Sequence, residues 1–246
     1  MLLALAGVAF AAGVVDAIAG GGGLLTVPAL LAAGLPPHIT LGTNKGQSVF
    51  GSGAALIRYA RAGLVDRRRA LICFPAGLAG ALGGAWLVLQ LKPDVLKPIV
   101  LGLLLASGTF IALRRPNANV DRPVRENAQL LEATIAAVIG CYDGFFGPGT
   151  GTFLIIAFVT VLHLGLKEAT ADAKVVNFAS NLATLGVMAW AGKVLWSVSL
   201  PMALGQAAGA WTGAHLAVKG GERLIRVVVL LVVVALVGKL AFDLWR

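Results

Sequence analysis

The sequence predicts an all-α polytopic membrane protein made of two inverted-topology repeats with glycine-broken half-helices. Hydrophobic residues make up 58% of the 246 residues and charged residues only 13%, whereas charged residues make up roughly a quarter of a typical soluble domain. The apolar residues also come in long runs without Asp, Glu, Lys or Arg, and about 20 such residues span the hydrocarbon core of a bilayer. The uncharged runs cover residues 17–44, 70–91, 144–166 and 194–218.

A duplication is the second observation behind this fold class. Residues 13–52 read GVVDAIAGGGGLLTVPALLAAGLPPHITLGTNKGQSVFGS, and residues 140–181 read GCYDGFFGPGTGTFLIIAFVTVLHLGLKEATADAKVVNFASN. In both copies an Asp precedes a glycine break and a Lys follows it, with an offset of 127 residues before the lysine and 129 from the lysine onward. Glycine-interrupted apolar segments in corresponding positions of two halves are the best sequence pointer to a transporter's binding site.

The first copy, residues 1–113, begins with an apolar segment at 2–19 that ends in a run of four glycines, which are poor helix formers. The following segment, 24–34, is too short to span a bilayer and predicts a half-helix or a re-entrant segment. Non-helical backbone at that depth must be buried in protein or face a watery cavity. A polar helix is expected from about residue 40 to 62, followed by spans at 70–91 and 95–113.

The polar stretch 114–127, RRPNANVDRPVREN, predicts a cytoplasmic linker because it is rich in Pro, Asn and charge. The second repeat is 128–246, and the two repeats form one integrated membrane domain. Its expected elements are 128–146, a Gly-Pro-Gly-Thr-Gly break, 152–164, 170–191, 196–218 and 224–244.

Charge and parity predict the orientation. Each half crosses the membrane an odd number of times, so the second copy should be inverted relative to the first. The loop 58–69 holds five arginines against one acid, and the linker and the 219–226 loop are also basic. Because cytoplasmic loops carry the excess of Lys and Arg, these three segments are expected in the cytoplasm and both termini outside.

Composition also excludes other functions. The net charge of +9 lies in short clusters between apolar runs, as in cytoplasmic loops, so we expect no nucleic-acid partner. Cys73 and Cys141 lie in apolar runs without a CxxC partner and predict neither a disulfide nor a metal site; we expect no metal and no cofactor. Ser52 in Gly51-Ser52-Gly53 is a weak serine-protease signal, because the full G-x-S-x-G motif is absent around it. We therefore predict that the protein is not an enzyme.

Lys45 and Lys174 are the strongest functional candidates. A lysine inside a membrane segment costs a few kcal/mol unless it is paired or near water, although lysines at helix ends can also snorkel to the interface. Each lysine is the first residue of a polar face on its helix, and an ammonium next to several hydrogen-bonding groups suits a small oxyanion. The alternative is that the Ser and Asn residues of these faces only join neighbouring helices through hydrogen bonds. The predicted substrate-binding set is Lys45, Lys174, Asn44, Thr43, Ser48, Ser52, Asn177, Asn181, Gly21, Gly22, Gly149 and Thr150.

Asp16 and Asp143 stand just before the two glycine breaks at matching positions. They could relay protons, pair with the lysines, or cap the half-helices. We treat them as candidate coupling groups, with proton or Na⁺ as the coupling ion. Free N–H groups at the breaks, together with the positive end of a half-helix, would attract anions.

The motifs AGGGGLLTVPALLAAGLPPHITLGTNK and YDGFFGPGTGTF…ATADAKVVNFASN resemble the TauE/SafE sulfite-exporter family of anion permeases, in particular its YfcA-like branch. The likeness covers nearly the whole chain. It implies two inverted repeats, movement of sulfur-containing or carboxylic anions such as sulfite, sulfonates and sulfoacetate, and a path lined by the glycine-rich and GTNK-type segments.

These observations predict a secondary permease or exporter for small sulfur-containing or organic oxyanions, working by alternating access. The alternative is a passive anion channel or facilitator, and a purely structural scaffold is disfavoured by the paired charges within the membrane. The expected location is the bacterial inner membrane, where the multi-pass protein contacts the lipid bilayer. A second copy of the chain is a candidate partner, in a homodimer.

Overall fold

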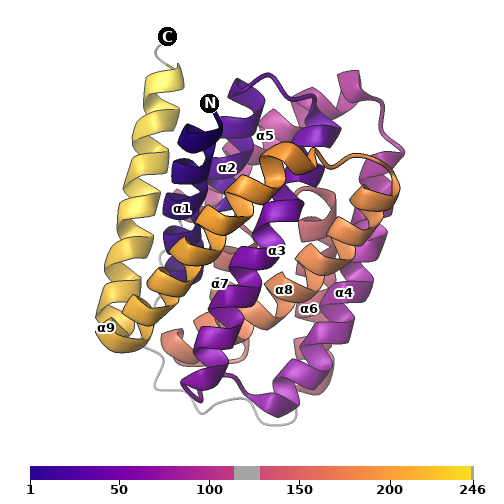
Figure 1. The fold of residues 1–246 in the computed structure, drawn as a ribbon. Helices are drawn as coiled ribbons and strands as arrows, with labels where there is room; N and C mark the ends of the chain where they lie inside the picture. Colours follow the sequence, from indigo (N-terminus) through magenta and orange to yellow (C-terminus); the bar gives the residue numbers. More distant parts are fainter. Residues whose placement is uncertain (114–127, 245–246) are drawn as a thin grey trace.

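The computed structural model describes residues 1–113 and 128–244, and within them it contains helices and no strands. The helices form one bundle (Figure 1), and the chain is an all-α polytopic membrane protein. Three of the described helical segments are long and apolar enough to cross a membrane: Leu2–Ala19, Arg67–Leu89 and Pro93–Phe110. The elements are α1 Leu2–Ala19, α2 Gly23–Ala32, α3 Pro37–Arg61, α4 Arg67–Leu89, α5 Pro93–Leu113, α6 Gln129–Phe145, α7 Thr150–Val161, α8 Leu166–Trp190 and α9 Trp196–Leu244.

Most element bounds agree with the sequence-based expectation, including both glycine breaks and both short helices after them. The two polar helices begin earlier than expected, at Pro37 for α3 and at Leu166 for α8. Pro37 is at the first helical position, where proline is favoured because its missing N–H would have had no partner. The predicted linker 114–127 lies outside the described residues, and the division into two repeats with inverted topology stays a prediction.

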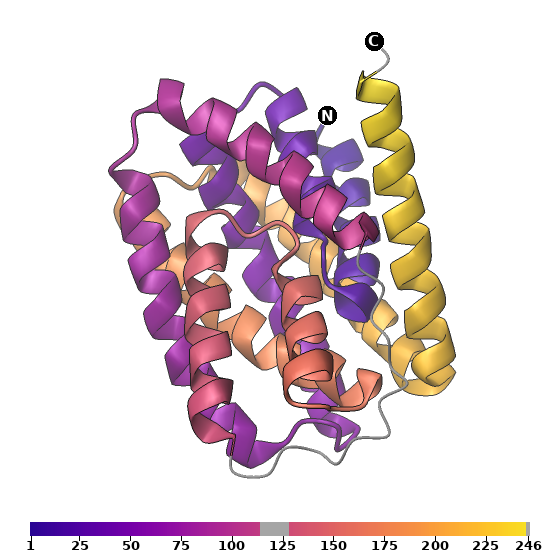
Figure 2. The same ribbon diagram turned by 180° about the vertical axis from the view of Figure 1, so that it is seen from behind.

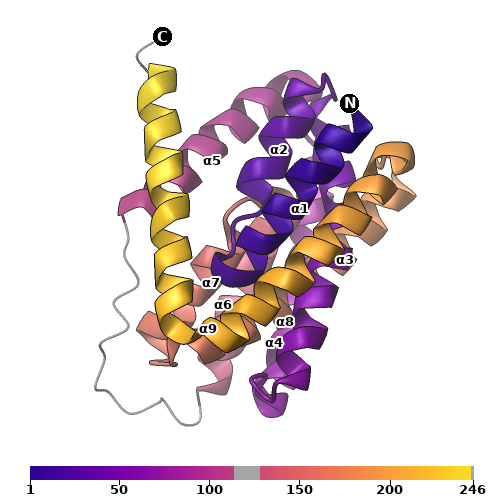
Figure 3. The same ribbon diagram turned by 60° about the vertical axis from the view of Figure 1, so that its left-hand side comes forward.

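One expectation is wrong: residues 196–218 and 224–244 are not two helices but parts of the single element α9. Glycine in a helix interior costs only about 1 kcal/mol relative to alanine, so the Gly220-Gly221 pair does not end the helix. The path of α9 nevertheless bends back sharply between its orange and yellow parts (Figures 1 and 3), which gives it two arms.

The glycine breaks place the two copies against each other. Gly20 and Gly21 have φ of 69° and 131°, and Gly147 and Gly149 have φ of 98° and 88°, a region that L side chains rarely adopt. A Cβ on Gly20 would lie 2.3 Å from the backbone of Gly151, so only glycine allows this approach. The breaks before α2 and α7 therefore touch, backbone to backbone, inside the bundle.

Small residues hold the outer pairs of helices together in the same way in both copies. A Cβ on Gly209 would meet the Phe10 carbonyl oxygen at 2.0 Å where α9 packs on α1, and one on Gly80 would meet that of Ala137 at 2.0 Å where α4 packs on α6. These contacts correspond under the repeat, and such small-residue packing is typical of membrane helices. In Figure 2, α5 runs obliquely across the bundle while α4 and α6 stand side by side. The polar helices α3 and α8 contact each other in the interior.

Candidate functional site

The two lysines are buried side chains of the inner helices. Lys45 on α3 is 2% exposed and Lys174 on α8 is 0% exposed, so neither ammonium reaches the surface as a snorkelling lysine would. A buried ammonium needs a charged partner and further hydrogen bonds to offset the loss of water. Both requirements are met within the chain.

Each lysine pairs with the aspartate of the other copy. Lys45 Nζ lies 2.7 Å from Asp143 Oδ1, and Lys174 Nζ lies 3.2 Å from Asp16 Oδ2. The aspartates therefore do pair with the lysines, one of the roles expected from the sequence. Neither lysine is therefore a free cation. The two ion pairs are neutral overall, and a substrate anion has to compete with a carboxylate for the ammonium.

A polar pocket lies where the glycine breaks meet, and it is lined from both copies. Lys45 and Asp143 line it together with Asp16, so one complete ion pair and one carboxylate of the second pair face the pocket. Lys174 is not among the lining residues; it contacts Asp16, donating both to its backbone oxygen and to Oδ2. The remaining lining residues are Gly21, Gly23, Asn44, Ser48, Gly147, Gly149, Thr150, Gly151, Asn177, Asn181 and Gln206.

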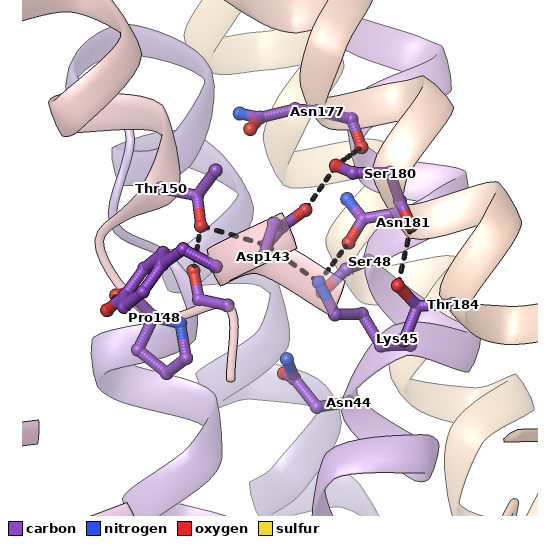
Figure 4. Close-up of polar contacts among 12 residues, drawn as sticks. Asn44, Lys45, Ser48, Asp143, Pro148, Thr150, Asn177, Ser180, Asn181 and Thr184 are labelled. Atoms are coloured by element: carbon purple, nitrogen blue, oxygen red, sulfur yellow. Dashed lines mark hydrogen bonds and ion pairs between the residues drawn. The ribbon is translucent and has the colours of Figure 1, made fainter. Parts of the chain in front are cut away.

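Asp143 lies at the centre of a hydrogen-bond network (Figure 4). Lys45 Nζ and Thr150 Oγ1, at 2.9 Å, donate to its Oδ1, and Ser180 Oγ donates to its Oδ2. Lys45 also donates to Asn181 Oδ1 at 2.9 Å. Helices α3, α6 and α7 each supply one of these groups and α8 supplies two, so movement of any of the four helices alters the network.

Asp16 is held in a different way. The backbone N–H groups of Gly21 and Gly22 donate to its Oδ1 at 3.1 and 3.2 Å, and Lys174 binds Oδ2. Asp16 thus holds the glycine break before α2 as well as pairing with a lysine. Two N–H groups expected to attract a substrate anion at the first break are therefore already used by this carboxylate.

Four residues of the predicted binding set do not line the pocket, namely Lys174, Thr43, Ser52 and Gly22. Thr43 Oγ1 accepts from the N–H of Leu195 at the start of α9, and Ser52 Oγ accepts from Asn181 Nδ2 at 3.3 Å. Their roles in the described structure are to join helices, which is the alternative that the sequence left open for such residues.

Two important residues were missed by sequence reasoning. Ser180, which binds Asp143, stands three residues after Asn177 and four before Thr184, a spacing that puts all three on one face of α8. That spacing could have identified it. Gln206 of α9 also lines the pocket, and its Oε1, like Asn177 Oδ1, has no hydrogen-bond partner within the described residues. A side-chain amide presents either its oxygen or its NH₂ after a half-turn, so both amides can donate to a ligand.

Comparisons with known proteins agree with this architecture. The family model described as "Sulfite exporter TauE/SafE" matches residues 5–240. The chain is 44% identical over 235 residues to the "Probable membrane transporter protein ORF9" of Sinorhizobium sp, covering 96% of this chain and 90% of that protein. It is 38% identical over 236 residues to the "Probable membrane transporter protein YfcA" of Escherichia coli K12, covering 96% and 88%. No solved structure matches.

The family match and the relatives span the helices that build the pocket, from α1 to most of α9. Each relative covers this chain almost from end to end, so the likeness extends to the two copies and both glycine breaks together. The chain therefore belongs to the TauE/SafE family and is a multi-pass membrane transporter.

Proposed function

We propose that this protein is a secondary transporter of a small sulfur-containing or carboxylic oxyanion in the bacterial cytoplasmic membrane, and that Lys45 binds the anion. The observation that carries the proposal is the buried Lys45 ammonium on the wall of a pocket that the glycine breaks of both copies enclose. A lysine buried in a membrane protein is costly and marks a functional position by default.

The groups around Lys45 suit an oxyanion better than a cation. Thr150 and Ser48 hydroxyls and the amides of Asn177, Asn181 and Gln206 line the same pocket, and each of these groups can donate a hydrogen bond. Oxyanions such as sulfonates and carboxylates accept several hydrogen bonds at once, and charge-assisted ones are the stronger kind. Carbon-bonded sulfonate and carboxylate groups are small enough to be contacted by a single ammonium and two or three amides.

The pseudo-symmetric lysine provides a matched control. Lys45→Met removes the pocket cation and should lower anion affinity about tenfold to a hundredfold, the equivalent of roughly 1–3 kcal/mol for a lost charge-assisted hydrogen bond. Lys174→Met should mainly lower thermal stability, because Lys174 does not line the pocket and joins α8 to the end of α1 through Asp16.

The experiment is a thermal-shift screen of sulfite, sulfoacetate, taurine, thiosulfate and simple carboxylates on purified protein, followed by calorimetry on the two variants. Lys45→Arg should recover only part of the affinity, because a planar guanidinium does not replace a compact ammonium. If Lys45→Met binds the selected anion as tightly as the unmodified protein does, Lys45 is not the binding cation and the proposal is wrong.

A further inference from the structure

Two hydroxyl groups beside Asp143 can each turn between the carboxylate and a backbone carbonyl. Thr150 Oγ1 lies 2.9 Å from Asp143 Oδ1 and 2.6 Å from the Gly147 oxygen, and Ser180 Oγ contacts Asp143 Oδ2 and lies 3.2 Å from the Asn177 oxygen. A hydroxyl has one proton to donate and two lone pairs to accept with. Each hydroxyl can therefore donate to the carboxylate, or donate to the carbonyl and accept from the carboxyl group (Figure 4).

This arrangement satisfies Asp143 both as a carboxylate and as a neutral acid. In the charged state it accepts from Lys45, Thr150 and Ser180. When a proton from water binds Oδ2, the new O–H donates to Ser180 Oγ, and the Ser180 proton turns to the Asn177 oxygen. No group is left without a partner, so the usual penalty for a buried unsatisfied donor is avoided.

Asp16 has no such freedom, although it occupies the same place in the first copy. Its Oδ1 faces two backbone N–H groups and its Oδ2 faces the Lys174 ammonium. All three groups can only donate, so an added proton on either oxygen would point at another donor. The hydrogen bonds of Asp16 therefore hold it as a carboxylate.

The difference between the two aspartates follows from different residue types at corresponding positions of the two copies. The residues of the first copy that correspond to Thr150 and Ser180 are Gly23 and Gly51, which have no hydroxyl. Pro148 corresponds to Gly21, and it lacks the N–H that Gly21 donates to Asp16. The second copy has thus exchanged a fixed backbone donor for two hydroxyl groups that can turn.

We propose that Asp143 is the proton-carrying group of the transporter: its protonation releases the Lys45 ammonium, which then binds the substrate oxyanion, so that one proton enters the site with each anion. The proposal rests on the proposed function. Before binding, the two ion pairs of the site are neutral overall, and the site stays neutral when a monovalent anion and a proton enter together. Binding the anion alone would leave two negative groups facing one ammonium, which is costly in a buried site.

The other charged or titratable groups around Asp143 do not carry the proton. Asp16, across the pocket, stays paired with Lys174. Tyr142, the next residue on α6, turns its hydroxyl to the Pro148 oxygen. On α4, Arg68 and Arg69 bind Glu132, which is 11 residues before Asp143 on α6 and thus about 16 Å away along the helix axis.

The test is calorimetry of the anion on purified protein in two cationic buffers, imidazole and bis-tris, whose heats of ionisation differ. The probes are methanesulfonate, isethionate and acetate, which are monovalent anions and take up no proton near neutral pH. The dependence of the observed heat on the buffer gives the number of protons taken up per anion bound. We expect one proton for the unmodified protein, and an affinity that falls about tenfold for each unit of rise in pH.

In Asp143→Asn, the amide oxygen can still accept from Lys45, and we expect anion binding without proton uptake and without pH dependence. Asp16→Asn is the matched variant: its melting temperature should fall, but each anion should still bring in one proton.

The outcomes separate this inference from the proposed function. If an anion binds without proton uptake, or if Asp143→Asn still takes up a proton, the inference is wrong and the proposed function stands. If none of the anions binds, the proposed function fails and the inference fails with it.

Discussion

Arg69, Glu132 and Asp172 form a buried charge cluster that gives a strong stability prediction. Arg69 binds Asp172 through Nη1 and lies 3.3 Å from Glu132 through Nε, and the three residues are only 8%, 1% and 2% exposed. The cluster joins the start of α4 to α6 and α8. Removing one member of a buried ion pair costs about 3–5 kcal/mol, because a charge is left buried without its partner.

The site at the corresponding positions of the duplication shows what an uncharged version of this cluster looks like. The positions that correspond to Arg69, Cys73, Glu132 and Asp172 hold Val198, Met202, Leu5 and Thr43, all buried. Leu5, Val198 and Met202 pack in one hydrophobic cluster. One hydrogen bond is present at both sites, from the backbone N–H of the residue just before α4 or α9. The N–H of Leu195 donates to Thr43 Oγ1 at 3.0 Å, and the N–H of Asp66 donates to Asp172 Oδ1 at 3.1 Å.

The prediction compares one substitution with a complete exchange. Arg69→Val should lower the free energy of unfolding by about 3–5 kcal/mol, since Asp172 then loses its cation. The quadruple variant Arg69→Val, Cys73→Met, Glu132→Leu and Asp172→Thr copies the corresponding uncharged site. It should recover most of that loss, because well-packed apolar residues replace buried ion pairs at little cost. The assay is equilibrium unfolding in mixed detergent micelles, followed by circular dichroism.

Two results would refute this reasoning. A loss of less than about 1 kcal/mol for Arg69→Val would show that the charges are solvated or paired elsewhere. A quadruple variant no more stable than Arg69→Val would show that the loss came from the missing volume of the arginine and not from an unpaired charge.

Two further predictions concern topology and packing. In a protein with Cys141 replaced by Ser, we place single cysteines at Ala62 and at its counterpart Ala191, which follow α3 and α8 directly. An impermeant reagent should label the two cysteines from opposite faces of the membrane. Labelling of both from the same face in intact cells would contradict the inverted repeats. The neighbouring glycines of α4 make a second pair: Gly84→Ala should destabilise by about 1–3 kcal/mol, since its Cβ would lie 1.9 Å from the Cys141 oxygen. Gly83→Ala meets no atom within 4 Å and should be neutral or stabilising by about 0.5–1 kcal/mol in the same unfolding assay.

Sequence alone determined the elements and the residues worth attention. Membrane helices are encoded locally, because about 20 apolar residues suffice for a span and consecutive glycines interrupt a helix wherever they occur. The duplication then drew attention to Asp16, Asp143, Lys45 and Lys174, because equivalent intramembrane charges are too costly to keep without a use.

Only the tertiary structure decided how these charges combine. Lys45 and Asp143 are 98 residues apart, and no local pattern states that each lysine pairs with the aspartate of the other copy. The same holds for the separation of Lys45, on the pocket wall, from Lys174, away from it, and for the approach of Gly20 to Gly151. Hydrogen-bond partners depend on distances of a few tenths of an ångström between helices, and those distances are set by the packing of the whole bundle. Ser180 illustrates the limit: its sequence position marks a polar helix face, but only the neighbouring α6 makes it a partner of Asp143.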